Sequence, residues 1–172
     1  LCMTRQSDRV GVVLSQSTSR EATCQLLEEA ERGGIREGML LVIEASPNKR
    51  LLLCRVSEIV PYHAFFTEGD PWSEARRKNL PLPEQVARRY EICKLELLIE
   101  LPGPREVIIP PHPGDYVYRI DPRVLQKDIF GVEEGTPGII WLGTQSGYEN
   151  CPVPLDVEAI PMHLAVFGVT GS

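Results

Sequence analysis

The final residues of the sequence have the types and spacing that bind phosphate. Gly168-Val169-Thr170-Gly171-Ser172 directly follows the apolar run His163 to Phe167. A phosphate-binding P-loop has the pattern G-x-x-x-x-G-K-S/T after a buried strand, because its glycines let backbone N–H groups curl around phosphate oxygens. Gly168, Thr170, Gly171 and Ser172 match the first half of this pattern. The alternative interpretation is a glycine-serine tail on a finished domain.

No other group of residues predicts a catalytic or metal site. Ser15 and Ser17 have no histidine at a spacing that suggests a partner, and the pairs Glu28-Glu29 and Glu133-Glu134 stand in polar contexts typical of exposed turns. The histidines lie far apart, and the cysteines show no C-x-x-C spacing, which predicts reduced structural thiols in a cytosolic protein. These residues are His63, His112 and His163, and Cys2, Cys24, Cys54, Cys93 and Cys151. We therefore expect neither a catalytic residue nor a bound metal ion in this chain.

A basic cluster is a second candidate for binding. It consists of Arg76, Arg77 and Lys78 together with Arg88 and Arg89. These side chains are candidates for a contact with a DNA backbone or a partner, but the acidic residues of 61–89 leave a net charge of only +1. That balance is more typical of a solvated helical surface. Both interpretations stay open.

Aromatic residues do not point to nucleic acid. Trp72 and Trp141 are interpreted as packing anchors, because a stacking platform for single strands needs more interleaved aromatic residues. Tyr116 and Tyr118 alternate along a predicted strand, where packing between strands is the default explanation.

Composition indicates a folded cytoplasmic protein. The chain of 172 residues is 42% hydrophobic and 24% charged, with a net charge of −6, which argues against a protein that coats nucleic acid with its whole surface. The longest apolar run, Met39 to Ile43, is too short to cross a membrane. No apolar segment with a cleavage site follows a charged start, so secretion is not expected.

The elements before the P-loop pattern are mostly strands. Arg9 to Leu14 is β-branched with a glycine inside, where a bulge or a close backbone approach is expected. Glu21 to Leu27 predicts a strand that runs on into a helical turn. Met39 to Ile43 and Leu51 to Val60 predict a hairpin.

The clearest strand is Tyr90 to Leu101, whose apolar residues alternate with charged ones. Pro102-Gly103-Pro104 ends it, and Glu106 to Ile109 is predicted as the next strand. Several short strands with frequent turn signals predict a small barrel or sandwich.

Helices are expected in two places. Residues 61–89 hold two candidate helices, one that begins at Ser73 and one with Pro83 near its start. A third helix has Asp121 as N-cap, Pro122 at its first position and Gly131 just past its end. Short apolar runs follow, from Ile139 to Leu142 and from Cys151 to Leu155, before the run at His163.

Three segments resemble the HerA family of hexameric DNA translocases: GDYVYRIDP at 114–122, IIWLGT at 139–144 and VPLDVEAIPMHLAVFGVTGS at 153–172. Over residues 3–110 the likeness rests on the pattern and order of the strands. The resemblance implies a small closed β-barrel of the HAS type, like the N-terminal barrel of ATP-synthase subunits, over 3–112, with 61–89 as a helical insertion. It further implies a linker and helix over 113–135 and the first strands of a RecA-like motor domain over 136–172.

The resemblance also implies a function. A HerA-type protein is a homohexameric ring that binds ATP and Mg²⁺, moves duplex DNA through its central channel and works with a NurA-type nuclease in DNA end resection and repair. Gly168, Thr170, Gly171 and Ser172 would be the first half of its Walker A loop, and His163 would be structural or orienting. The Walker A lysine would come after Ser172, so we expect this chain alone not to hydrolyse ATP and to serve ring assembly and partner docking.

Two departures from the family and two alternatives accompany this interpretation. The segment 61–89 is longer than the family's compact connections, and Pro161-Met162 stand where the family more often has an arginine. The first alternative is a self-contained barrel that binds protein or nucleic acid. The second is the barrel of a related ring ATPase with a different cargo.

Overall fold

The computed structural model describes residues 8–83, 85–132 and 135–158. The chain divides into two compact units, Leu1–Ile120 and Asp121–Ser172. The first contains the barrel and a long hairpin extension, and the second contains a short helix and a small sheet.

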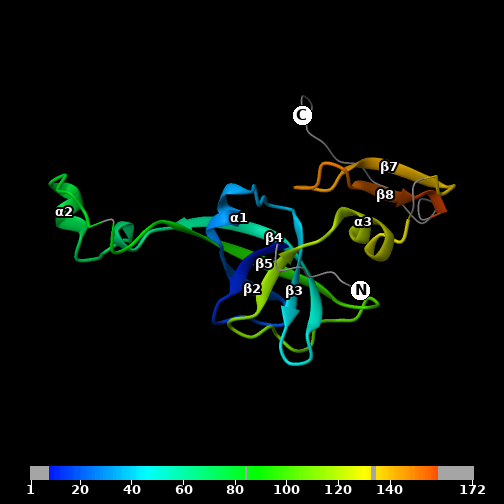
Figure 1. Cartoon of the computed structure of the whole chain (residues 1–172), viewed down its shortest axis with the longest axis horizontal. Coiled ribbons are helices and arrows are strands. Elements are labelled where there is room, and N and C mark those ends of the chain that lie inside the picture. Colours follow the sequence, from blue (N-terminus) through cyan, green and yellow to red (C-terminus); the bar gives the residue numbers. More distant parts are fainter. Residues whose placement is uncertain (1–7, 84, 133–134, 159–172) are drawn as a thin grey trace. The chain divides into compact units, whose positions relative to one another are not determined.

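The first unit is a closed antiparallel barrel (Figure 1). Its strands follow the order β1-β2-β5-β4-β3-β6, and β6 pairs back with β1. Their bounds are β1 Arg9–Val13, β2 Glu21–Leu26, β3 Leu40–Ala45, β4 Arg50–Tyr62, β5 Tyr90–Leu101 and β6 Tyr116–Arg119. The prediction of a mainly β fold with a small barrel is therefore confirmed, and the sandwich alternative is wrong. Closure leaves the barrel without an unpaired edge strand.

Alternating side chains make the barrel core. On β5, Cys93, Leu95 and Leu97 are buried, whereas Lys94 and Leu98 between and beside them are exposed. This is the period-2 pattern of a strand with one face in a core. The side chains of largest volume that are fully buried are Met39, Leu41, Ile43, Leu52, Leu95, Ile120 and Leu125, of which all but Leu125 belong to the first unit.

Gly11 lies where β1 comes closest to β2. A Cβ atom at this position would lie 2.9 Å from the Gln25 carbonyl oxygen and 3.2 Å from the Cys24 sulfur. The pairing of β1 with β6 also shifts register between Arg9 and Gly11. The expected bulge and close backbone approach are both present, because only glycine leaves room for them.

The segment after β2 forms the helical turn that the sequence predicts. The strand passes through Leu27 into the short helix α1 (Glu28–Arg32), which ends at Gly33. Gly34, with φ of +74°, then turns the chain toward β3.

The predicted strand from Glu106 to Ile109 is wrong. These residues form no strand, and in this region only Arg105 makes an isolated bridge, to Glu100. The strand that closes the barrel is β6 instead. Proline provides the physical reason: Pro104 and Pro110 flank the run and have no N–H to donate to a ladder.

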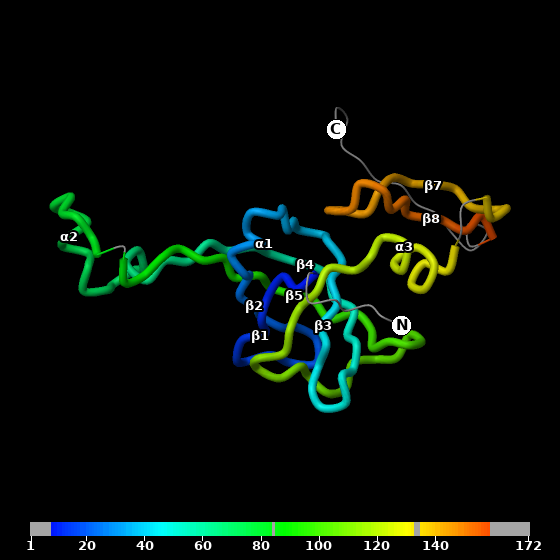
Figure 2. The backbone as a smooth tube through the Cα atoms, viewed as in Figure 1, coloured from blue at the N-terminus to red at the C-terminus, as the bar shows by residue number. Residues whose placement is uncertain are grey.

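Beyond the barrel, β4 and β5 continue as a two-stranded ribbon that pairs as far as Tyr62 and Tyr90. We call residues 61–90 the arm; Figures 1 and 2 show it projecting from the barrel strands. It contains a 3-10 turn, η2 (Ala64–Phe66), and the helix α2 (Ser73–Arg77). The helix predicted to begin at Ser73 is confirmed. The described residues around Pro83 form no helix, because the closely spaced Pro81 and Pro83 interrupt helical hydrogen bonding.

The second unit begins with the predicted third helix. Asp121 accepts a hydrogen bond from the Arg123 backbone N–H at 2.9 Å and caps α3 (Pro122–Val124), which continues into a π-helical turn, η3 (Leu125–Ile129). Gly131 follows with φ of +69°, as expected of a residue just past a helix end. The two apolar runs form β7 (Ile139–Thr144) and β8 (Pro152–Asp156), an antiparallel pair.

None of the helices in the described part of the chain is long and apolar enough to cross a membrane.

Candidate functional site

The predicted phosphate-binding residues Gly168, Thr170, Gly171 and Ser172 lie outside the described residues, as do His163 and the run that leads to them.

Three cysteines meet inside the barrel. Cys24 on β2 is directly opposite Cys93 on β5, and both are fully buried, as is Cys54 on β4. A hydrogen bond between the Cys24 and Cys93 thiols, together with burial, raises the pKa of Cys24. Burial also raises the pKa of Cys54. Neutral thiols are poor nucleophiles and poor metal ligands, and no group of three or more potential ligands that could hold a metal ion occurs among the described residues.

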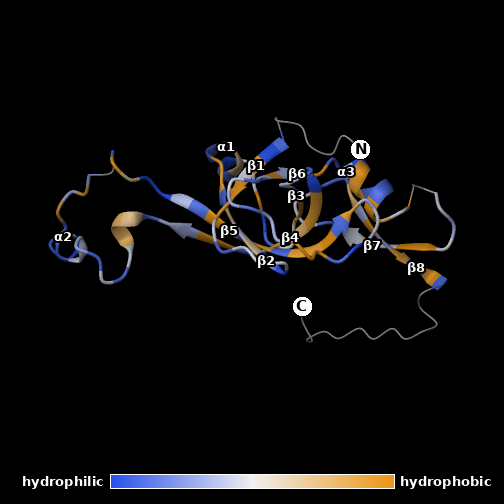
Figure 3. Ribbon diagram, turned by 90° about the horizontal axis from the view of Figure 1, so that it is seen from below, coloured by the Kyte–Doolittle hydropathy of each residue, from blue (hydrophilic) through white to orange (hydrophobic). Residues whose placement is uncertain are grey.

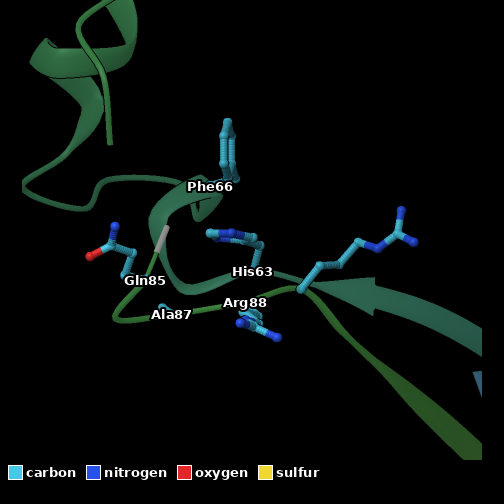
Figure 4. Close-up of a pocket in the computed structure, with 6 residues that line it drawn as sticks. His63, Phe66, Gln85, Ala87 and Arg88 are labelled. Carbon is cyan, nitrogen blue, oxygen red and sulfur yellow. The ribbon is translucent and has the colours of Figure 1, made fainter. Parts of the chain in front are cut away.

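A hollow lies on the arm. Six residues line it, and its volume is about 530 Å³. Figure 4 shows His63 and Phe66 on the segment that leaves β4, with Gln85, Ala87 and Arg88 on the segment that returns to β5. Arg89 completes the lining. We call this feature the arm hollow. It joins residues that are more than twenty positions apart in the sequence, so no local motif could have identified it.

Ring packing holds one wall of the arm hollow. The His63 Nδ1 accepts a hydrogen bond from the Phe65 backbone N–H at 3.1 Å and caps the 3-10 turn. Phe65 is buried, with its ring centroid 4.8 Å from that of Trp72. Phe66 instead stays 59% exposed, and its ring stands edge-on to His63 at 4.9 Å. The contact with Phe65 is consistent with the interpretation of Trp72 as a packing anchor.

Arg76 organises the tip of the arm. Its guanidinium donates to Asp70 Oδ2 at 2.9 Å, to the Thr67 carbonyl at 3.0 Å and to the Phe65 carbonyl. The ion pair is largely shielded, with side-chain exposures of 24% for Arg76 and 11% for Asp70. One planar group therefore satisfies three acceptors within residues 65–70.

The predicted basic cluster is divided by the fold. Arg77 and Lys78 both pair with Glu74 on the exposed side of α2, at 3.0 and 3.7 Å. Arg88 and Arg89 are exposed, line the arm hollow and form no ion pair within the described residues. Figure 3 shows that hydrophobic and hydrophilic residues both occur along the arm. Of the five basic side chains, Arg88 and Arg89 thus line the hollow without an ion pair to another described residue.

Acid is expected to loosen the arm tip. Burial by itself would raise the pKa of Asp70, but hydrogen bonds from Arg76 and Thr67 outweigh it and hold that pKa below its ordinary value of 3.8. A lowered pKa means that the stabilisation is present above 3.8 and is lost as the pH falls through the lowered value. We expect Trp72 fluorescence, followed in a Trp141→Phe background, to report loosening of the tip in that range.

In the same assay, Arg76→Ala is expected to loosen the tip at neutral pH and to remove the acid transition. Arg77→Ala, which removes an exposed pair, is the matched control and is expected to change neither. An unchanged acid transition in Arg76→Ala would show that the ion pair does not hold the tip.

At the opposite end of the barrel lies a second exposed surface. Residues 102–113, which we call the distal loop, follow the end of β5, whereas the arm precedes its start. Ile108 is 79% exposed and Ile109 is 50% exposed. The loop is anchored by Arg50, whose Nη1 donates to the Ile109 carbonyl and to Glu100, each at 3.1 Å. Two large apolar side chains are thus presented to solvent on an anchored loop.

The chain leaves the barrel at the end away from the distal loop. Tyr116 of β6 pairs with Glu44, near the turn into β4, and Arg119 pairs with Leu41, at the other end of β3. Ile120 therefore ends the unit on the side of the arm, and the distal loop is on the far side.

Comparison of the sequence with models of protein families gave no match, and comparison with curated protein sequences gave none either.

Proposed function

We propose that this chain is the assembly and docking part of an ATP-driven hexameric DNA translocase of the HerA type. The observation that carries the proposal is the order of two features: a closed six-stranded barrel over the first unit, followed by residues 114–172 with their family-like segments. A glycine-rich tail alone would not account for the segments that precede it.

In this proposal the barrel is of the HAS type, and residues 136–172 begin a RecA-like motor domain. The exposure of β7 supports this: Ile140, Trp141 and Leu142 are 45%, 39% and 63% exposed. Consecutive exposed apolar residues on a strand are typical of a surface that other parts of a larger domain cover. Gly168, Thr170, Gly171 and Ser172 would contribute the first half of the Walker A loop, and ATP and Mg²⁺ would be bound by the motor. The barrel alone would not turn over ATP.

The partner in this proposal is a NurA-type nuclease, which would dock on the distal loop. The loop is on the barrel end away from Ile120, the last residue of the first unit. Ile108 and Ile109 supply the apolar contact area that protein interfaces concentrate at their centres.

Two measurements test the proposal. The coding sequence after Ser172 is expected to continue with Gly-Lys-Ser or Gly-Lys-Thr, and the longer protein is expected to hydrolyse ATP and to form hexamers. A different continuation would reject the motor and favour the self-contained binding module.

Docking is tested with the nuclease encoded by the neighbouring gene. Ile108→Asp is expected to weaken its binding about ten-fold or more, the loss typical of a central apolar contact. The matched control is Val86→Asp on the arm, because Val86 is 80% exposed and Ile108 is 79% exposed. Equal losses in both variants would reject the distal loop as the docking surface. A neighbouring gene for a different effector would favour a related ring ATPase with another cargo.

A further inference from the structure

We propose that the arm hollow binds single-stranded nucleic acid, with a base against the Phe66 ring and phosphates on Arg88 and Arg89. The inference does not depend on the proposed ring ATPase, because it is carried by the residues of the arm. A self-contained barrel with the same arm would bind in the same way.

Charge defines the ligand as an anion. Arg77 and Lys78 share the single carboxylate of Glu74, and Arg76 pairs with Asp70. Arg88 and Arg89 are the basic residues that line the hollow, and no carboxylate within the described residues pairs with them. A guanidinium presents several N–H donors in a planar fork that matches phosphate oxygens. Although the whole chain carries −6, residues 61–89 are net positive, so the anion is drawn to the arm and not to the barrel.

The Phe66 ring favours a ligand that has a planar face. Phe66 is held edge-on to His63, yet 59% of the residue is exposed. It also borders a second hollow of about 400 Å³ with Leu80 and Pro81, where the Arg76 guanidinium lies 5.8 Å from the ring centroid. An exposed ring on an anchored turn is a stacking surface for a base.

Further aromatic residues lie along the arm. Tyr62 and Tyr90 pair across the base of the arm with ring centroids 5.1 Å apart, and Tyr62 is 36% exposed. The two tryptophans alone are too few for a stacking platform. The hairpin adds Phe66, Tyr62 and Tyr90 on the same arm as Arg88 and Arg89, which form no ion pair within the described residues, and aromatic rings with basic side chains are the combination that single-strand binding surfaces use.

Competing ligands use only part of this surface. A duplex presents phosphates to Arg88 and Arg89, but its base faces are stacked inside the helix and cannot reach Phe66. An acidic peptide offers carboxylates to the arginines and no planar face to the ring. A single strand satisfies both, and the volume of about 530 Å³ is within the range of pockets that hold small organic ligands.

The test measures binding of a labelled oligothymidylate of about twelve nucleotides by fluorescence anisotropy. Phe66→Ala is expected to weaken binding about ten-fold, the usual effect of removing one stacked ring. The double variant Arg88→Ala/Arg89→Ala is expected to weaken it at least as much. It should also make the slope of log K against log salt shallower by about 1.4, because each phosphate contact to a single strand contributes roughly 0.7.

The matched control is Arg77→Ala/Lys78→Ala, which removes two positive charges from the same arm outside the hollow. It is expected to bind oligothymidylate within about two-fold of the unchanged chain, since paired, exposed charges contribute little. Circular dichroism establishes that each variant is folded. The proposal is overturned if the unchanged chain does not bind, if the control loses as much affinity as Arg88→Ala/Arg89→Ala, or if a duplex or polyglutamate binds as tightly.

Discussion

Replacing Leu95 by alanine is expected to lower the free energy of unfolding by about 3 kcal/mol, the usual cost of a leucine-sized cavity in a packed core. Leu95 is fully buried on β5, the strand that pairs with both β2 and β4. Its side chain fills the centre of the barrel, where the strands cannot move together to refill the lost volume without breaking their register. Urea denaturation followed by circular dichroism measures the change.

Leu98→Ala on the same strand is the matched control. Leu98 is 38% exposed and lies on the outer face of the barrel. The same substitution there is expected to cost about 1 kcal/mol or less, because little area is taken from water and no cavity forms. Equal losses at the two positions would contradict the inside-outside alternation of β5.

Asp115→Ala is expected to cost about 3 kcal/mol, because it removes a carboxylate that accepts three hydrogen bonds, and bonds to a charged acceptor are the strong ones. Asp115 is 6% exposed and is the buried charged residue of the described chain. Its carboxylate accepts from the Ser46 Oγ at 2.7 Å, from the Ser46 N–H at 3.1 Å and from the His112 N–H at 2.7 Å. Its carbonyl also accepts from Val13 at 2.8 Å, so this residue joins the β3–β4 turn, the distal loop and β1.

Two further variants test whether the loss of stability comes from the hydrogen bonds of Asp115 or from removing any aspartate side chain. Asp115→Asn keeps one acceptor oxygen but replaces the other with an NH₂ group, which cannot accept a hydrogen bond. It is therefore expected to recover only part of the lost stability. Asp121→Ala removes a helix N-cap whose side chain accepts from Arg123, and about 1 kcal/mol is expected there. A loss at Asp115 no larger than at Asp121 would show that the three contacts do not act together. Hydrogen exchange of the Ser46 and His112 amides locates the effect.

Local sequence patterns predicted the elements whose cause is itself local. Alternation along Tyr90 to Leu101 identified β5, and the glycine inside Arg9 to Leu14 identified the bulge of β1. The cap at Asp121 and the glycine at 131 identified the ends of the third helix. Each of these signals depends on residues a few positions apart, so the pattern and the structure have the same physical origin.

Local sequence patterns failed where pairing with a distant segment decides the secondary structure. Residues 106–109 have strand-forming side chains, yet β6 occupies the place beside β1 that a closing strand needs. The run therefore becomes the distal loop and exposes Ile108. At Pro83 the cause is local instead: a turn closed by a hydrogen bond from the Val86 N–H to the Pro83 carbonyl takes the place of the predicted helix.

By itself, the sequence determined that the chain is mainly β, where most strands lie, and that its last residues match half of a phosphate-binding pattern. Only the tertiary structure decided that the barrel closes, that Asp115 joins three segments, and that the basic residues of 61–89 divide into paired and available sets. The reason is that closure depends on pairing between β1 and β6, and that Ser46, a partner of Asp115, lies 69 positions away in the sequence. The ion pairs of the arm join residues at most six positions apart, but the placement of Arg88 and Arg89 beside Phe66 depends on the β4–β5 hairpin. Composition reduced residues 61–89 to a net charge of +1, whereas the fold pairs Asp70 with Arg76 and Glu74 with Arg77 and Lys78, and places Arg88 and Arg89 in the same hollow as Phe66.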